Sequence, residues 1–240
     1  MPYELCRTRT RSFHMIQLTL AALFFIGIHF LIAGTRWRDR LVARYGERVY
    51  RIGFSSLSVL GLFWLIYAYR HAPYIETWGQ LAWFKPVAAL LMLVAFILAV
   101  TGVTTLNPTA VNGESRLYEA EPARGILRVT RHPFLWGVGL WAIVHLIANG
   151  DAAALVLFGS LLLLTIGGTR SIDAKRQRRF GEQWAKFTAV TSNIPFNAIR
   201  EGRNQLKLAE IGWWRIALAL LLYLGMMHFH TQLFGVSPLF

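Results

Sequence analysis

The sequence predicts an all-α integral membrane protein with about six transmembrane helices. Of its 240 residues, 55% are hydrophobic and only 15% are charged, a composition typical of membrane rather than soluble chains. Six apolar stretches approach the roughly 20 residues that a helix needs to cross about 30 Å of hydrocarbon. They lie at residues 13–34, 50–69, 84–106, 134–148, 152–168 and 212–233. We therefore expect a single membrane domain over residues 1–240 with the lipid bilayer as its main partner.

The fourth and fifth stretches are the shortest. Only Asn149, Gly150 and Asp151 separate them, and Asn, Gly and Asp are turn-forming residues. We expect these two helices to form a short, tight hairpin that need not cross the membrane completely.

Charge predicts the orientation of the chain. The net charge is +13, and 20 of the 25 Lys and Arg residues lie in or beside the first, third and fifth loops. By the positive-inside rule these loops are cytoplasmic and both termini lie outside. The basic N-terminal tail fits this orientation if translation starts at Met15. Basic residues beside anionic lipid account for the charge, so no nucleic acid partner is expected. The single cysteine, Cys6, excludes disulfides within the chain and cysteine-rich metal sites.

Two loops are long enough to carry structure of their own. In the fifth loop, residues 170–211, Ile172, Phe180, Trp184 and Phe187 alternate with charges, which predicts an amphipathic helix on the cytoplasmic surface. Pro195 should end that helix. The third loop is rich in Pro, Gly and Asn and leads into His132, so it is either a lid or a plain connector.

The ionisable side chains in the interior of the predicted spans are histidines and a few tyrosines. All twelve Asp and Glu residues fall outside them. His29, late in the first span, and His145, late in the fourth, are therefore the candidate ligand or catalytic residues, because burying an ionisable group in a bilayer is costly. The remaining histidines near span ends are read as polar tips at the water boundary: His14, His71, His228 and His230.

Imidazole in an apolar pocket without carboxylates suits haem iron. Zinc is less favoured, because the spans offer no Cys, Asp or Glu as further ligands. His29 and His145 are thus the predicted metal ligands. Aromatic residues nearby could form the walls of a porphyrin pocket, or simply face lipid or pack: Phe24, Phe25, Phe30, Trp136 and Trp141.

Depth in the membrane is an objection to this pairing. At about 1.5 Å per residue, His29 lies about 8–10 Å from the cytoplasmic edge and His145 about 20 Å. Both can flank one haem only if the first span extends past Gly34 or the fourth starts below the membrane surface.

The motif Arg131-His132-Pro133 precedes the fourth span. Pro133 suits the first turn of a helix, and helix N-termini attract anions. Arg131 and His132 would add donors for a haem propionate or a cofactor carboxylate. An Arg–His anchor at the membrane interface is an equally good interpretation.

Three segments carry a resemblance to a known family: "GIHFLIAGTRWRDRLVARYGERVYRIGFSSLS", "TRHPFLWGVGLWAIVHLIANGD" and "LFGVSPLF". Over about residues 16–240 the chain resembles the NnrU family of bacterial membrane proteins. The resemblance implies an inner-membrane location and a role in nitrite or nitric oxide metabolism. The family's plant and cyanobacterial relative, the zeta-carotene isomerase, is a haem b enzyme acting on an apolar polyene. The resemblance to this isomerase implies that His29 and His145 are haem ligands, although Ala142 stands where the isomerase has a cysteine.

A second, more distant resemblance is to isoprenylcysteine and phospholipid methyltransferases, which bind S-adenosylmethionine. The matching positions are Arg131, His132, Pro133, Asn149, Asp173, Phe180, Gly181 and Trp184. Ile172–Asp173 stands where those enzymes have two glutamates. The sequence thus leaves three functions open: a haem-binding isomerase or nitrogen-oxide factor, a membrane methyltransferase acting on a lipid or small thiol, and a non-enzymatic accessory factor.

Overall fold

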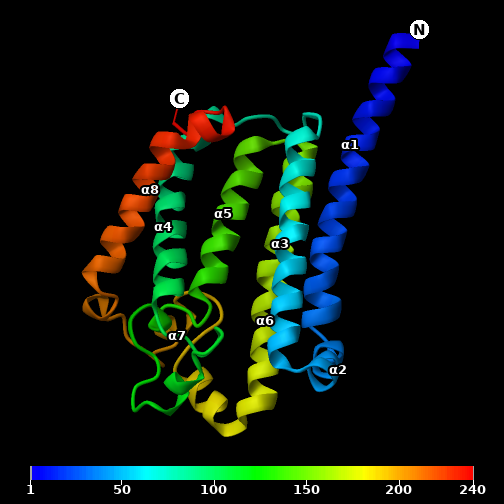
Figure 1. The fold of residues 1–240 in the computed structure, drawn as a ribbon. Helices are drawn as coiled ribbons and strands as arrows, with labels where there is room; N and C mark the ends of the chain where they lie inside the picture. The colour runs from blue at the N-terminus through cyan, green and yellow to red at the C-terminus, as the bar shows by residue number, and fades with distance from the viewer. Residues whose placement is uncertain (1, 240) are drawn as a thin grey trace. The chain divides into compact units, whose positions relative to one another are not determined.

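The computed structural model describes residues 2–239, with side chains described from Thr10 onward. The side chains of Cys6, Arg7 and Arg9, on which part of the sequence argument depends, lie outside the described residues. The described chain is helical, and its β-structure is one isolated bridge between Glu76 and Asp151. Figure 1 follows the helices along the chain. The α-helices are α1 (Pro2–Gly27), α2 (Arg36–Tyr45), α3 (Glu47–His71), α4 (Lys85–Thr104), α5 (Pro133–Asn149), α6 (Ala152–Ala189), α7 (Asn197–Arg200) and α8 (Trp213–Phe234).

Shorter helical turns link these elements. A π-helix, η1, continues α1 over Ile28–Ala33. The remaining 3-10 turns are η2 (Ala82–Phe84), η3 (Glu114–Tyr118), η4 (Gly125–Arg128) and η5 (Leu208–Glu210). In the described residues, five helices are long and apolar enough to span a membrane, and α5 is a shorter apolar helix. The all-α membrane fold predicted from the sequence is therefore confirmed.

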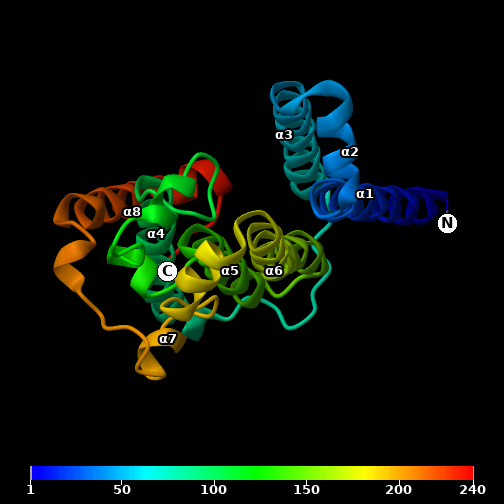
Figure 2. The same ribbon diagram turned by 90° about the horizontal axis from the view of Figure 1, so that it is seen from below.

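The chain divides into two compact units. Unit 1 comprises residues 1–81 and 145–168, and unit 2 comprises residues 82–144 and 169–240. In unit 1, α1 packs beside α3, and α2 lies next to both (Figure 2). In unit 2, α4 packs along α8. The unit boundaries fall within α5 and α6, so each of these helices contributes residues to both units.

The predicted hairpin of α5 and α6 is present, but its second arm is longer than expected. Gly150 adopts a φ of +58°, and a Cβ atom there would lie 2.0 Å from the Gly79 carbonyl oxygen, so glycine is required. Asp151 caps α6: its Oδ1 accepts the amide N–H groups of Ala153 and Ala154 at 2.9 and 3.1 Å. From there α6 runs for 38 residues to Ala189.

The helix predicted in the fifth loop is the continuation of α6. Gly181 breaks its regular geometry, with φ 48° and ψ −113°. Beyond the break, Trp184 and Phe187 are buried in the protein instead of facing lipid. They pack in a core of unit 2 with Leu98, Leu117, Ala123, Ile126, Leu127 and Val129. Five of these partners come from the third loop, residues 107–132, which is therefore a packed part of the fold and not an open polar connector.

Small residues bring α4 and α5 together within unit 2. A Cβ atom on Gly137 of α5 would lie 2.8 Å from the carbonyl oxygen of Ala95 and from the amide of Ala99. On α4, a Cβ atom on Gly102 would lie 2.5 Å from the amide nitrogen of Phe134. Backbones that approach this closely are typical of helix packing in membranes, where small residues stand at the contact.

Candidate functional site

The Arg131-His132-Pro133 motif lies at the start of α5 in unit 2, as predicted, with Pro133 at the first helical position. Asp173 of α6 joins it. Arg131 directs Nε and Nη2 to the two carboxylate oxygens of Asp173, with both Nε contacts at 3.0 Å. His132 donates its Nε2 hydrogen to Oδ1 of the same carboxylate at 2.7 Å. One aspartate thus binds both members of the sequence motif.

This Arg131–His132–Asp173 cluster is largely buried. The side chain of His132 is fully buried, and those of Arg131 and Asp173 are only 13% and 19% exposed. The backbone carbonyl of Arg131 also accepts hydrogen bonds from Asn107 Nδ2 at 3.1 Å and from Thr109 Oγ1 at 3.2 Å. The guanidinium already has a bidentate anionic partner, so it is not free to hold a propionate in this arrangement.

The electrostatics of the cluster keep His132 neutral. Burial lowers the pKa of His132 below its ordinary value and the Arg131 cation lowers it further, which together outweigh the favourable hydrogen bond to Asp173. In the neutral ring, Nε2 carries the proton given to Asp173, and Nδ1 keeps a lone pair. That buried Nδ1 has no hydrogen-bond partner among the described residues. An Asp–His pair of this kind can orient a base.

A second cluster of unit 2, which the sequence did not single out, surrounds Arg128. The Glu210 carboxylate binds Arg128 at Nε (2.7 Å) and Nη2 (2.9 Å) and accepts the Gly125 amide at 2.9 Å. The hydrogen bonds from Arg128 lower the pKa of Glu210 to about 2. Asn204 accepts from Nη1 at 2.7 Å. These residues are separated by about 80 positions, so no local pattern reveals the pairing, and the signal available was only a lone arginine within an apolar run.

His29 and His145 both belong to unit 1. His29 stands in the π-helix η1, a form often found at functional sites. Its Nδ1 lies 2.7 Å from the Phe25 carbonyl oxygen. This contact selects the tautomer with hydrogen on Nδ1 and leaves the Nε2 lone pair for a metal, as in many metal-bound histidines. The rings of Phe25 and Phe54 lie 4.6 and 5.3 Å from the His29 ring, centroid to centroid.

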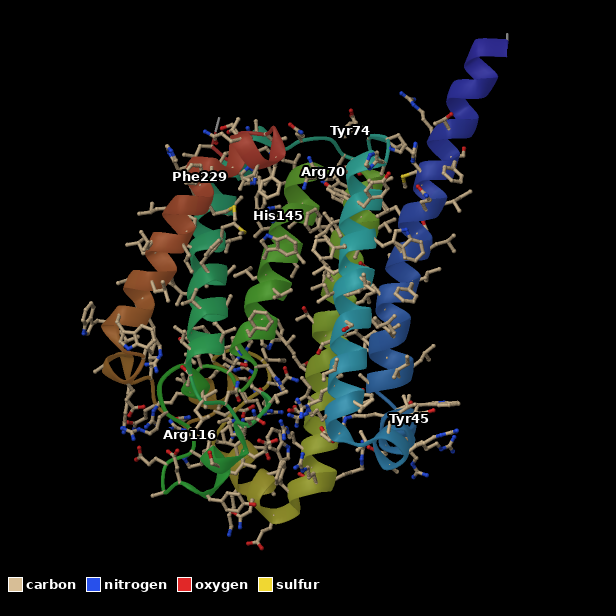
Figure 3. All side chains as sticks on the ribbon, in the orientation of Figure 1. Tyr45, Arg70, Tyr74, Arg116, His145 and Phe229 are labelled. Atoms are coloured by element: carbon tan, nitrogen blue, oxygen red, sulfur yellow. The ribbon has the colours of Figure 1, made fainter. Side chains whose placement is uncertain are left out.

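His145 has different neighbours. Its ring lies 5.1 Å from that of Phe158 on α6, and Phe158 contacts Tyr69 near the end of α3 at 5.9 Å. Figure 3 labels Tyr45 at one end of unit 1 and Arg70 and Tyr74 at the other, with His145 toward the Arg70 end. Since η1 leads directly into α2, which ends at Tyr45, His29 belongs to the opposite end.

The separation of His29 and His145 can be estimated by counting residues along two helices, α3 and α6. Along α3, Phe54 is at the level of His29 and Tyr69 near that of His145, a span of fifteen residues or about 22 Å. Along α6, Phe158 contacts His145, while a Cβ atom on Gly167 would lie 2.4 Å from the ring of Phe30, the neighbour of His29. Those nine residues correspond to about 13 Å. Two axial imidazole nitrogens on one iron stand only about 4 Å apart, so these rings do not fit as a pair around a single haem.

The other predicted site residues are distributed between the units. Phe24 and Phe30 lie with His29 in unit 1, whereas Trp136 and Trp141 belong to unit 2. Trp136 donates Nε1–H to the Asn193 side chain at 3.3 Å and packs against the core around Trp184. Among the described residues, no group of three or more His, Cys, Asp or Glu is arranged to hold a metal ion.

Comparison with models of known protein families shows which family the chain belongs to. The model of the family described as NnrU protein matches residues 17–238. The chain belongs to the NnrU family. Two curated relatives of this NnrU protein are both described as 15-cis-zeta-carotene isomerase, chloroplastic. The protein of Zea mays is 26% identical over 203 residues, and that of Arabidopsis thaliana is 26% identical over 196 residues.

In both alignments 80% of the NnrU chain is covered, but only 53% and 52% of the relatives. The chain thus spans about half the length of the curated relatives it matches. No solved structure matches it significantly.

Proposed function

We propose that this NnrU protein is a membrane-embedded isomerase that acts on an apolar polyene dissolved in the bilayer and binds haem b through His29. The observation that carries the proposal is the similarity, across 80% of the chain, to two proteins described as 15-cis-zeta-carotene isomerase. The five apolar spans suit a substrate that enters from lipid.

His29 is the better supported of the two intramembrane ligands. Its Nδ1 is anchored on the Phe25 carbonyl, which orients the ring and directs Nε2 away from its own helix. Phe25 and Phe54 give it aromatic neighbours of the kind that line a porphyrin pocket. Haem, when bound, would supply a redox-active iron centre. His145 is too far along the helices to share that iron with His29, so a second ligand to the same haem must come from elsewhere.

Spectroscopy of the purified full chain tests the cofactor. We expect a Soret band that shifts on dithionite reduction and a stoichiometric pyridine haemochrome. His29→Ala should lose most of the haem, and His228→Ala on α8 serves as the matched control. A chain without haem, even when haem precursor is supplied during expression, would contradict the cofactor part of the proposal.

Co-expression in bacteria that accumulate 15-cis-zeta-carotene tests the reaction, with isomers separated by chromatography. Conversion that disappears in His29→Ala supports the proposal. If haem is present but the carotene is unchanged, nitric oxide added to the reduced protein tests the nitrogen-oxide role by a further Soret shift. If there is neither haem nor conversion and a second protein co-purifies, the accessory-factor interpretation replaces the proposal.

The methyltransferase alternative receives less support. Arg131, His132 and Asp173 do come together, but they bind one another in a closed cluster. Trp184, which would line the cofactor cleft, is 2% exposed and packs in the core of unit 2. Calorimetric titration with millimolar S-adenosylmethionine should therefore show no binding.

A further inference from the structure

Two further histidines of unit 1, which the sequence indicated only as polar tips, lie opposite each other. His14 stands on α1 and His71 is the last residue of α3. Their ring centroids are 6.2 Å apart, with an angle of 31° between the ring planes. Because α1 and α3 are antiparallel neighbours, this pair lies at the end of α3 remote from the basic helix α2.

Each ring has a nitrogen available to a ligand. His71 places Nδ1 at 2.8 Å from the Tyr67 carbonyl oxygen, so its proton sits on Nδ1 and its Nε2 carries the lone pair. The Nδ1 atom of His14 is buried and has no hydrogen-bond partner among the described residues. A buried acceptor without a donor is costly, and a bound cation is one way to satisfy it.

The spacing of the rings fits coordination. Two imidazoles that bind one ion through metal–nitrogen bonds of about 2.0–2.1 Å hold their centroids about 5–6.5 Å apart. We propose that His14 and His71 form a binding site for a divalent transition-metal ion that prefers imidazole, such as Cu²⁺, Ni²⁺ or Zn²⁺. Water completes the coordination, because His71 is exposed.

This site is separate from the proposed haem ligand. His29 follows His14 by fifteen residues of the same helix, or about 22 Å. A metal bound at the pair would link α1 to the last residue of α3. Metal binding and haem content are therefore independent readouts, and failure of one does not imply failure of the other.

Copper binding to the full chain in detergent tests the site. The protein should carry a tag without histidines and the change Cys6→Ser, so that neither a tag nor the thiol binds metal. We expect one Cu²⁺ per chain, with an electron paramagnetic resonance spectrum that shows nitrogen ligation. His14→Gln and His71→Gln should each weaken Cu²⁺ and Zn²⁺ binding at least tenfold. Zn²⁺ should raise the thermal midpoint of the parent protein but not of these two variants.

His228→Gln and His230→Gln on α8 are the matched controls, because they remove histidines from a different helix by the same substitution. Unchanged metal affinity in both His14→Gln and His71→Gln would overturn the proposal, and so would an equal loss in the α8 controls. If either His14→Gln or His71→Gln misfolds, the other variant tests the proposal, since the site requires each histidine. Its thermal midpoint should then be the same with and without Zn²⁺.

Discussion

The Nε2 atom of His132 and the Oδ1 atom of Asp173 lie 2.7 Å apart, and this contact joins the start of α5 to the polar half of α6. Asp173 also receives the guanidinium of Arg131. This carboxylate stabilises the fold, because removing it would leave the two buried donors, Arg131 and His132, without a partner.

Replacing Asp173 by Asn should therefore destabilise the protein by about 3 kcal/mol, the usual cost of leaving one partner of a buried ion pair unmatched. Thermal unfolding in detergent measures the change. Glu182→Gln is the control on the same helix, because its pair with Lys186 is exposed on the surface, and it should leave the midpoint unchanged. Equal effects of the two changes would show that the cluster is not a structural contact.

Acid should weaken unit 2 through His132. Burial holds the pKa of His132 in the folded state below its unfolded value of about 6.5. The unfolded chain thus binds more protons, and stability falls as the pH drops below about 6.5. His132→Gln does not titrate, so the loss of thermal stability between pH 7 and pH 5 should be smaller in the variant. A larger loss in the variant would contradict a neutral His132.

Glu210 titrates in a lower range. Its pKa of about 2 in the folded state lies below the ordinary value of 4.5. Its contribution is complete above about pH 4.5 and is lost as the pH falls toward 2. Glu210→Gln should destabilise the protein by about 2 kcal/mol at neutral pH, since it removes charged hydrogen bonds to Arg128. The difference from the parent protein should narrow progressively below pH 4.5.

Gly137 should tolerate no side chain. In Gly137→Ala the new methyl group would lie 2.8 Å from backbone atoms of Ala95 and Ala99, so α4 and α5 must separate and the thermal midpoint should drop by several degrees. Gly225→Ala on α8 meets nothing within 4 Å and should be neutral or slightly stabilising. A neutral Gly137→Ala would mean that the two helices can shift apart at little cost.

The sequence predicted the helices well because hydropathy and length alone determine a membrane span. All six predicted stretches correspond to helices, and the turn at Gly150 and Asp151 was visible from residue type. It did not predict that α6 continues to Ala189, since the charges after Gly168 were read as a surface helix. It could not predict that Trp184 and Phe187 form a core, because their partners come from a distant loop.

For the site, the sequence supplied the residue types but not their partners. It placed Arg131 and His132 at a helix start, and the second resemblance named Asp173, yet only the fold shows that all three bind one another. The depth argument that separates His29 from His145 rests on the fixed rise of a helix per residue. The pairing of His14 with His71 depends on the antiparallel register of α1 and α3, which no local pattern encodes.

The two-residue link between α5 and α6 has a consequence for how this family can vary. Loops usually absorb insertions and deletions freely. Here one added residue would rotate the start of α6 by about 100° relative to its cap, turning Phe158 away from His145 and detaching Asp151 from the amides that it holds. Related chains should therefore keep the length of this link unchanged even where its neighbours differ.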